Sequence, residues 1–194
     1  MTFSILQSEY LQLSPVGIFP HARGYQNVDA GALSALVKNF NSFLARLGRR
    51  FAGVPFYIGH PDVPGYENIY TDRKAYGWIM DLELREDGLY GWPKWSAAGQ
   101  DLIANGHFKF LSPYWEATKI GMKDGKPMFR PTVLISVGLT NEPNLPVLPL
   151  ANSSDRAEEA AEPVPLLGCA LPIGDGEAAF TAEDAESAER PSRS

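Results

Sequence analysis

Apolar residues alternate with other residues in several short segments of the chain, a spacing typical of half-buried β-strands. In the segment 108–116, one parity combines aromatic rings with a single hydroxyl: Phe108, Phe110, Ser112 and Tyr114. Pro113 follows this serine and has no N–H to give to a β-ladder. It therefore predicts a sheet edge, a bulge or a strand end at this point.

The other strand signals predict hairpins. Segments 75–85 and 88–93 alternate on either side of an acidic, glycine-containing turn. The strand around Ser112 continues toward a second turn at 123–126. Beyond it, the run 131–140 is the most β-prone in the chain and has apolar residues on both parities, which indicates a strand buried on both faces. The short apolar run 54–59 predicts one more buried strand.

Helical periodicity is clearest between Asp29 and Gly48. Asp29 is a good N-cap, and Gly48 is a candidate for the stop signal. We expect the whole apolar stripe of this helix to pack in the core. Its members recur at three- and four-residue steps: Leu33, Leu36, Val37, Phe40, Phe43, Leu44 and Leu47. A second, shorter helix is predicted over 97–105, with Ser96 as its cap.

Charge divides the chain into two parts. Residues 1–150 hold 14 Lys and Arg against 13 Asp and Glu, whereas residues 151–194 hold 3 against 10. We expect one folded domain, residues 1–150, followed by a disordered or weakly helical Ala/Glu-rich tail, residues 151–194. The nearly neutral domain argues against a nucleic-acid partner. No apolar run is long enough to span a membrane, so no membrane partner is expected either.

Candidate chemistry centres on His60 and Ser112. His60 follows the predicted strand 54–59 and is held between Gly59 and Pro61. A base and a hydroxyl at two strand ends can perform acyl transfer, in which the imidazole removes the proton of the nucleophile. The alternative is structural: Ser112 bonds its own backbone and His60 caps its strand. No phosphate-binding loop or metal-ligand spacing is present, and the single cysteine excludes a thiolate cluster, so we expect no cofactor and no metal.

Several motifs, in this order, resemble the Mu-like prophage I protein family, over about residues 10–150. They are Ile58-Gly59-His60-Pro61-Asp62, Ala75-Tyr76-Gly77-Trp78-Ile79, Gly88-Leu89-Tyr90-Gly91, Phe110-Leu111-Ser112-Pro113-Tyr114-Trp115 and Ser136-Val137-Gly138-Leu139-Thr140-Asn141-Glu142-Pro143-Asn144-Leu145-Pro146. The family comprises phage head-maturation proteases with a scaffolding extension. It is related to the prohead proteases of tailed phages and to herpesvirus assemblin.

The resemblance implies an α+β fold, a small, mostly antiparallel β-barrel flanked by helices. It implies a serine endopeptidase with Ser112 as nucleophile and His60 as general base, which cleaves scaffold and capsid proteins, with self-cleavage as a further option. The implied partners are the phage scaffold and major capsid proteins, with self-association as a further option. The implied location is the host cytoplasm, inside the assembling prohead. The acidic tail would be the start of a scaffolding region.

The third catalytic member is where this sequence departs from the family pattern, which places a histidine or an acid about 25 residues after the serine. Ser136 is the nearest polar residue by position, Glu142 lies a few residues late, and Asp62 lies beside His60. The third member is therefore Ser136 or Glu142, or the site is a dyad.

Two other functions compete with the protease. One is a non-enzymatic capsid-assembly scaffold with the same fold, in which the serine and histidine are remnants. The other is a carbohydrate- or peptide-binding domain, suggested by four tryptophans, although aromatics at this density usually belong to a core: Trp78, Trp92, Trp95 and Trp115.

Overall fold

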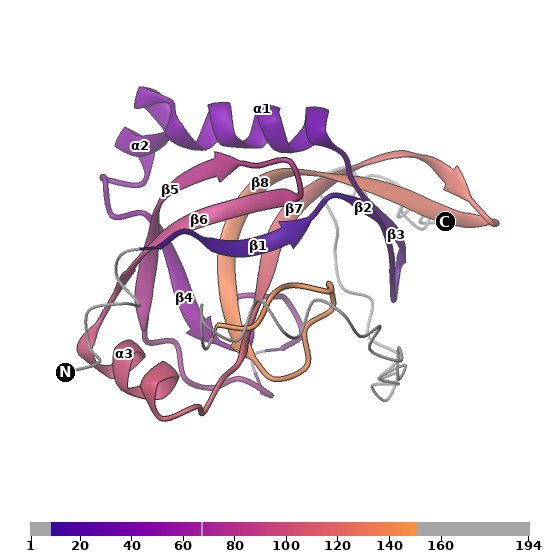
Figure 1. The fold of residues 1–194 in the computed structure, drawn as a ribbon. Helices are drawn as coiled ribbons and strands as arrows, with labels where there is room; N and C mark the ends of the chain where they lie inside the picture. The colour runs from indigo at the N-terminus through magenta and orange to yellow at the C-terminus, as the bar shows by residue number, and fades with distance from the viewer. Residues whose placement is uncertain (1–8, 67, 151–194) are drawn as a thin grey trace, which may run out of the picture.

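The computed structural model describes residues 9–66 and 68–150, which form a single eight-stranded sheet and three helices (Figure 1). The strand order is β1-β6-β5-β4-β8-β3-β2, and β7 pairs with β8 off this path. The strands are β1 (Leu11–Pro15), β2 (Gly17–His21), β3 (Gly24–Val28), β4 (Val54–Ile58), β5 (Gly77–Leu84), β6 (Gly88–Trp95), β7 (Phe110–Lys123) and β8 (Lys126–Thr140).

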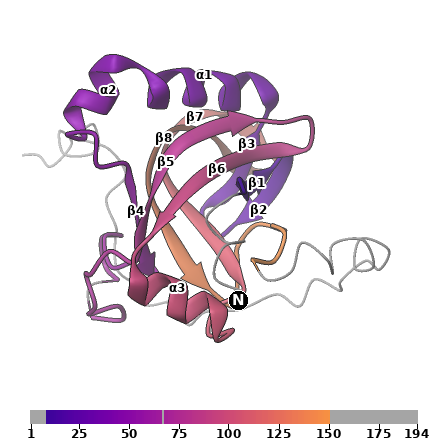
Figure 2. The ribbon, with the colours of Figure 1, turned by 60° about the vertical axis from the view of Figure 1, so that its left-hand side comes forward.

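The sheet curls into a nearly closed barrel, as Figures 1 and 2 show from two directions. Helices α1 (Ala30–Asn41) and α2 (Phe43–Gly48) lie across one end, and α3 (Ala97–Ala104) lies at the opposite end. Most strand pairings are antiparallel, but β8 pairs in parallel with both β3 and β4. The predicted α+β class is confirmed, and the sheet is mixed.

Strand β8 is central to the barrel because it is long enough to pair with three other strands. Along one edge it pairs with β7 from Lys126 to Thr140. Along the other edge it pairs with β3 near its start and with β4 near its end. Strand β7 pairs only with β8 among the described strands, so Pro113 lies in an edge strand, as its missing N–H predicts.

Side-chain alternation divides the end of β8 between the core and the outside of the barrel. Phe56 of β4 and Val137 of β8 are paired, fully buried and part of the core cluster. Their neighbours Tyr57 and Gly138 are also paired and therefore lie on the opposite face of the sheet. This outer face carries the candidate site.

The long helix predicted from Asp29 to Gly48 is broken at Ser42. Asp29 caps α1 by accepting from the Ala32 N–H, as predicted, but the Ser42 hydroxyl accepts from the Ala45 N–H and begins a new helix. Because Ser42 has an extended backbone, the apolar stripe does not continue along the sheet. Core packing is confirmed for the buried residues of α1, including Leu33, Leu36 and Phe40.

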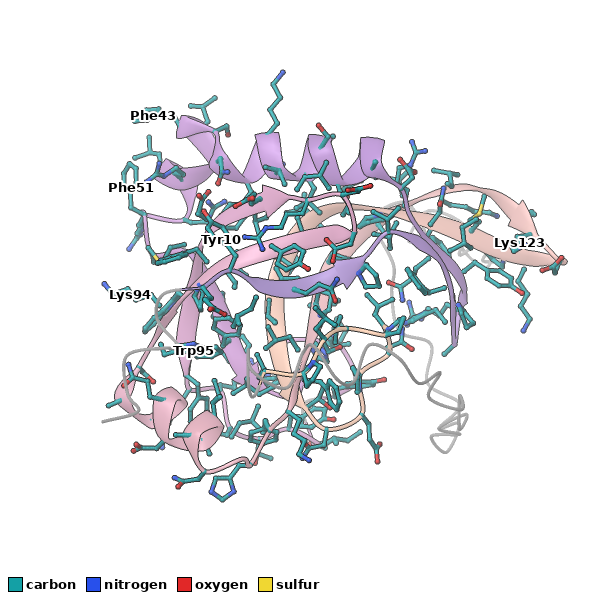
Figure 3. All side chains as sticks on the ribbon, viewed as in Figure 1. Tyr10, Phe43, Phe51, Lys94, Trp95 and Lys123 are labelled. Carbon is teal, nitrogen blue, oxygen red and sulfur yellow. The ribbon has the colours of Figure 1, made fainter. Side chains whose placement is uncertain are left out.

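For α2 the prediction of core packing was wrong. Phe43 is 68% exposed, Leu44 is 78% exposed and Leu47 is 50% exposed. Figure 3 shows Phe43 and Phe51 at the outer end of this helix, away from the barrel. Apolar residues at three- and four-residue steps show that a segment can form a helix. They do not show that another part of the protein packs against the apolar face of that helix.

Both predicted hairpins are present, as β5–β6 and β7–β8. Strand β3 was not predicted, because Gly-Tyr-Gln-Asn-Val lacks an alternating apolar pattern. The predicted tail, residues 151–194, lies outside the described residues. Within the part that is described, no helix has the length and apolar character that a membrane span requires.

Candidate functional site

Gly59 positions His60 at the end of β4. The Gly59 N–H donates to the Leu139 carbonyl at 3.0 Å, which continues the parallel pairing with β8. Its φ of +60° turns the chain out of the strand, and a Cβ here would lie 2.2 Å from the ring of Tyr70. Only glycine satisfies both conditions without strain. The Val63 N–H then donates to the His60 carbonyl at 3.2 Å and closes the turn.

Ser112 reaches the same place from the other side of β8. It lies in β7 directly opposite Gly138, and Gly138 is in turn opposite Tyr57 of β4. Strand β8 thus separates the strand that carries the serine from the strand that leads to the histidine. Both side chains meet above Gly138 on the outer face.

His60 Nε2 and Ser112 Oγ are 3.1 Å apart, within hydrogen-bonding distance, although 52 residues separate them in sequence. The absence of a side chain at Gly138 makes room for the ring. A Cβ at that position would lie 2.9 Å from His60 Cε1, 3.0 Å from Nε2 and 2.6 Å from the Gly59 carbonyl oxygen. The imidazole therefore rests directly on the backbone of β8.

Burial sets the protonation state of this histidine. Desolvation lowers the pKa of His60 below its ordinary value of 6.5, and the negative charge of Asp62 partly opposes that shift. The neutral imidazole thus predominates at neutral pH and can accept the serine proton at Nε2. The Tyr114 ring lies against His60 in a T-shaped arrangement, with centroids 6.2 Å apart, and burial raises the pKa of its phenol.

The two candidates for the third member differ in their surroundings. Ser136 is fully buried, and it lies opposite Tyr114 on the same face of β8 as Gly138. Glu142 is exposed beyond the end of β8, where its N–H donates to Thr140 Oγ1. His60 Nδ1 has no hydrogen-bond partner, so neither side chain is joined to the imidazole.

The sequence indicated Gly59 as a residue that holds His60 in place but gave no such role to Gly138, although both glycines decide where the ring of His60 lies. The glycine of the Ser-Val-Gly run was visible, but its role depends on a cross-strand partner that only the fold supplies. Two of the four tryptophans, Trp95 and Trp115, belong to the core. Across residues 9–66 and 68–150, no three His, Cys, Asp or Glu side chains gather as a metal site would require.

The family model of the Mu-like prophage I protein, N-terminal domain, matches residues 11–152. The chain belongs to this family. The match covers both strands that flank the end of β8, and therefore includes the whole candidate site of this prophage I domain. Comparison with curated proteins and with solved structures gave no match.

Proposed function

We propose that this prophage I domain is a serine endopeptidase of phage head maturation, with Ser112 as nucleophile and His60 as general base. The observation that carries the proposal is the 3.1 Å contact between the serine hydroxyl and a half-buried imidazole whose pKa is lowered. A hydroxyl is a weak nucleophile unless a neutral base accepts its proton, and this geometry provides such a base.

The reaction follows from the roles of these two groups. As Ser112 Oγ attacks a peptide carbonyl, its proton passes to His60 Nε2, and a tetrahedral intermediate forms. The imidazolium then gives that proton to the departing amine, and the peptide C–N bond breaks. In the second half, His60 takes a proton from water, which attacks the acyl-serine. The proton returns to Ser112 as the carboxylic product leaves.

The wider context is also part of the proposal. The barrel would be related to the assemblin and prohead protease fold, and the substrates would be the scaffold and major capsid proteins of the phage. The enzyme would act inside the assembling prohead, in the host cytoplasm. Membership of a prophage family supports this context.

The test is to replace Ser112 by Ala and to follow processing of co-expressed scaffold and capsid proteins from the same prophage over time, by intact mass. We expect loss of cleavage in Ser112→Ala and in His60→Ala. Ser34→Ala is the matched control, because Ser34 is exposed on α1, away from the sheet end. Cleavage at the wild-type rate in Ser112→Ala would overturn the assignment.

One observation favours the alternative, a capsid-assembly scaffold without activity. His60 Nδ1 is buried and has no partner, so no side chain orients the imidazole as in a complete triad. If the pair is a remnant, the Ser112→Ala chain should support head assembly as well as the wild type, with no cleavage in either. Electron microscopy of the heads, together with the mass measurement, distinguishes the two functions.

A further inference from the structure

Three buried polar atoms without a hydrogen-bond partner are associated with the candidate site: His60 Nδ1, Asp62 Oδ1 and Ser136 Oγ. Only two other such atoms occur in the residues that the structure describes, on Arg49 and Trp95. A buried polar atom without a partner has lost its hydrogen bonds to water and gained none in return, so such atoms are few and each needs an explanation. Their association with one histidine calls for a shared explanation.

The strand register brings Ser136 to the site. Ser136 and Gly138 are two residues apart on β8, so their side-chain positions lie on the same face. Gly138 underlies the His60 ring, and Ser136 lies opposite Tyr114, whose ring packs against that imidazole. Ser136 therefore lies on the face of the sheet that carries His60, beside the tyrosine that packs against the imidazole.

Asp62 comes to the site through the turn that follows β4. It lies two residues after His60, inside the turn closed by the bond from the Val63 N–H to the His60 carbonyl. Its charge acts on His60, on Tyr57 of β4 and on Tyr114 of β7. The ring of Tyr70 lies beside Gly59 on the other side of this turn, and the positive charges of Arg73 and Arg23 act on Tyr57 and Tyr114, respectively. On the same face, β8 contributes Ser136, Gly138 and Thr140, none of which is charged.

The three atoms are complementary as donors and acceptors. If Nε2 accepts from Ser112, the neutral His60 ring carries its proton on Nδ1, which is then a donor without an acceptor. The Asp62 carboxylate is an acceptor without a donor. A serine hydroxyl can accept one hydrogen bond and donate another, so its chemistry allows Ser136 to satisfy both the imidazole and the carboxylate.

We propose that Ser136 and Asp62 are positioning residues that form a relay behind His60. In this relay the Nδ1–H donates to Ser136 Oγ, whose hydroxyl donates to Asp62 Oδ1; neither bond is closed in this structure, so each forms by side-chain rotation or through one bridging water. The proposal rests on the proposed function, because it supplies the orienting acid that the Ser112–His60 pair lacks. It places this acid in the turn after β4, whereas the family pattern places it on the strand after the serine.

The relay has two consequences for the reaction. It fixes the tautomer with the proton on Nδ1, which leaves Nε2 free to accept from Ser112. It also places a negative charge behind the imidazolium that forms as the serine attacks. Because Asp62 and Ser136 act through His60 and not on the substrate, their removal should lower kcat and leave KM nearly unchanged.

The experiment measures His60 directly in the full chain, by nitrogen NMR of the labelled imidazoles. The chain has three histidines, and His60→Gln identifies the signal. In the wild type we expect the Nδ1–H tautomer, with a proton protected from solvent exchange. Asp62→Asn should lower the pKa of His60 further and mix the two tautomers. Ser136→Ala should also populate both tautomers of His60.

Asp72→Asn is the matched control. Asp72 lies in the same connection between β4 and β5, but its carboxylate is bonded to the Lys74 N–H and the Tyr76 hydroxyl. This variant should leave the His60 pKa and tautomer unchanged. If the enzyme cleaves, Asp62→Asn should lower kcat about 100-fold and Asp72→Asn should not.

The NMR readout does not depend on activity, so the relay and the protease can fail separately. A wild-type His60 with its proton on Nε2, or with a rapidly exchanging Nδ1 proton, would overturn the relay even if the variants do not fold. The same holds if His60 behaves alike in Asp62→Asn and Asp72→Asn. Absence of cleavage together with the expected NMR result would overturn the proposed function and leave the relay in place.

Discussion

Replacing Gly138 by Ala tests whether the bare backbone of β8 holds the imidazole in place. The added Cβ would lie 2.6 Å from the Gly59 carbonyl oxygen and 2.9–3.0 Å from two atoms of the His60 ring. Ordinary contacts of a Cβ begin at 3.4 Å, so the substitution is short of space by about 0.8 Å at the carbonyl and 0.4 Å at the ring. The carbonyl is backbone and cannot rotate away.

The end of β4 must therefore move relative to β8 and carry His60 with it. The Nε2–Oγ distance is now 3.1 Å, and a movement of this size takes it beyond the reach of about 3.2 Å. A displacement near 1 Å costs about 100-fold in rate. Overpacking of this kind also lowers the free energy of unfolding by about 1–3 kcal/mol.

The assay is the rate constant of scaffold processing at 25 °C, with thermal unfolding recorded on the same samples. Gly48→Ala is the control, since a Cβ there meets nothing within 4 Å. We expect Gly138→Ala to remain folded at the assay temperature and to lose about two orders of magnitude in rate. The idea that Gly138 positions the His60 ring would be refuted if Gly138→Ala had wild-type activity. It would also be refuted if the loss of activity were fully explained by the fraction of the variant that is unfolded at the assay temperature.

Three further outcomes follow from burial and charge. Leu36→Ala should cost about 2–5 kcal/mol in urea unfolding, because Leu36 is 2% exposed, whereas Leu44→Ala, at a residue 78% exposed, should change stability by no more than about 0.5 kcal/mol. Burial lowers the pKa of His60, so the unfolded chain binds that proton more readily; stability should fall as the pH drops through and below about 6.5, and less so in His60→Gln. The hydrogen bond to Asp81 raises the pKa of Tyr10 to about 12, so the stability from this bond should be present below pH 10 and lost toward pH 12. Ultraviolet titration should show a tyrosine that ionises near pH 12 in the wild type and at lower pH in Asp81→Asn.

The sequence predicted the elements whose signals are local. Asp29 and Ser96 cap their helices as expected, and the turn at Asp124-Gly125 joins the second hairpin. Pro113 indicated a sheet edge, a bulge or a strand end, and it lies in β7, which pairs with β8 alone among the described strands. These inferences need only the residue itself and its immediate neighbours.

The remaining features depend on which element lies next to which. The apolar spacing of α2 could not reveal that Phe43 and Leu44 face solvent. The role of Gly138 arises from a histidine that precedes it by 78 residues and packs on it only in the fold. Proximity of His60 and Ser112 was a hypothesis drawn from chemistry and resemblance, and the structure brings the two together. Their catalytic role stays a prediction.

Strands β4 and β7 flank the end of β8 but do not pair with each other. Among the strands that the structure describes, β8 is the last in chain order and the only one that pairs with both of these strands. A growing polypeptide that has left the ribosome only as far as β7 holds both residues but has no means of joining them. Under the proposed function, the chain would be unable to cut anything, its own earlier segments included, until synthesis has passed Thr140 and the final strand has inserted.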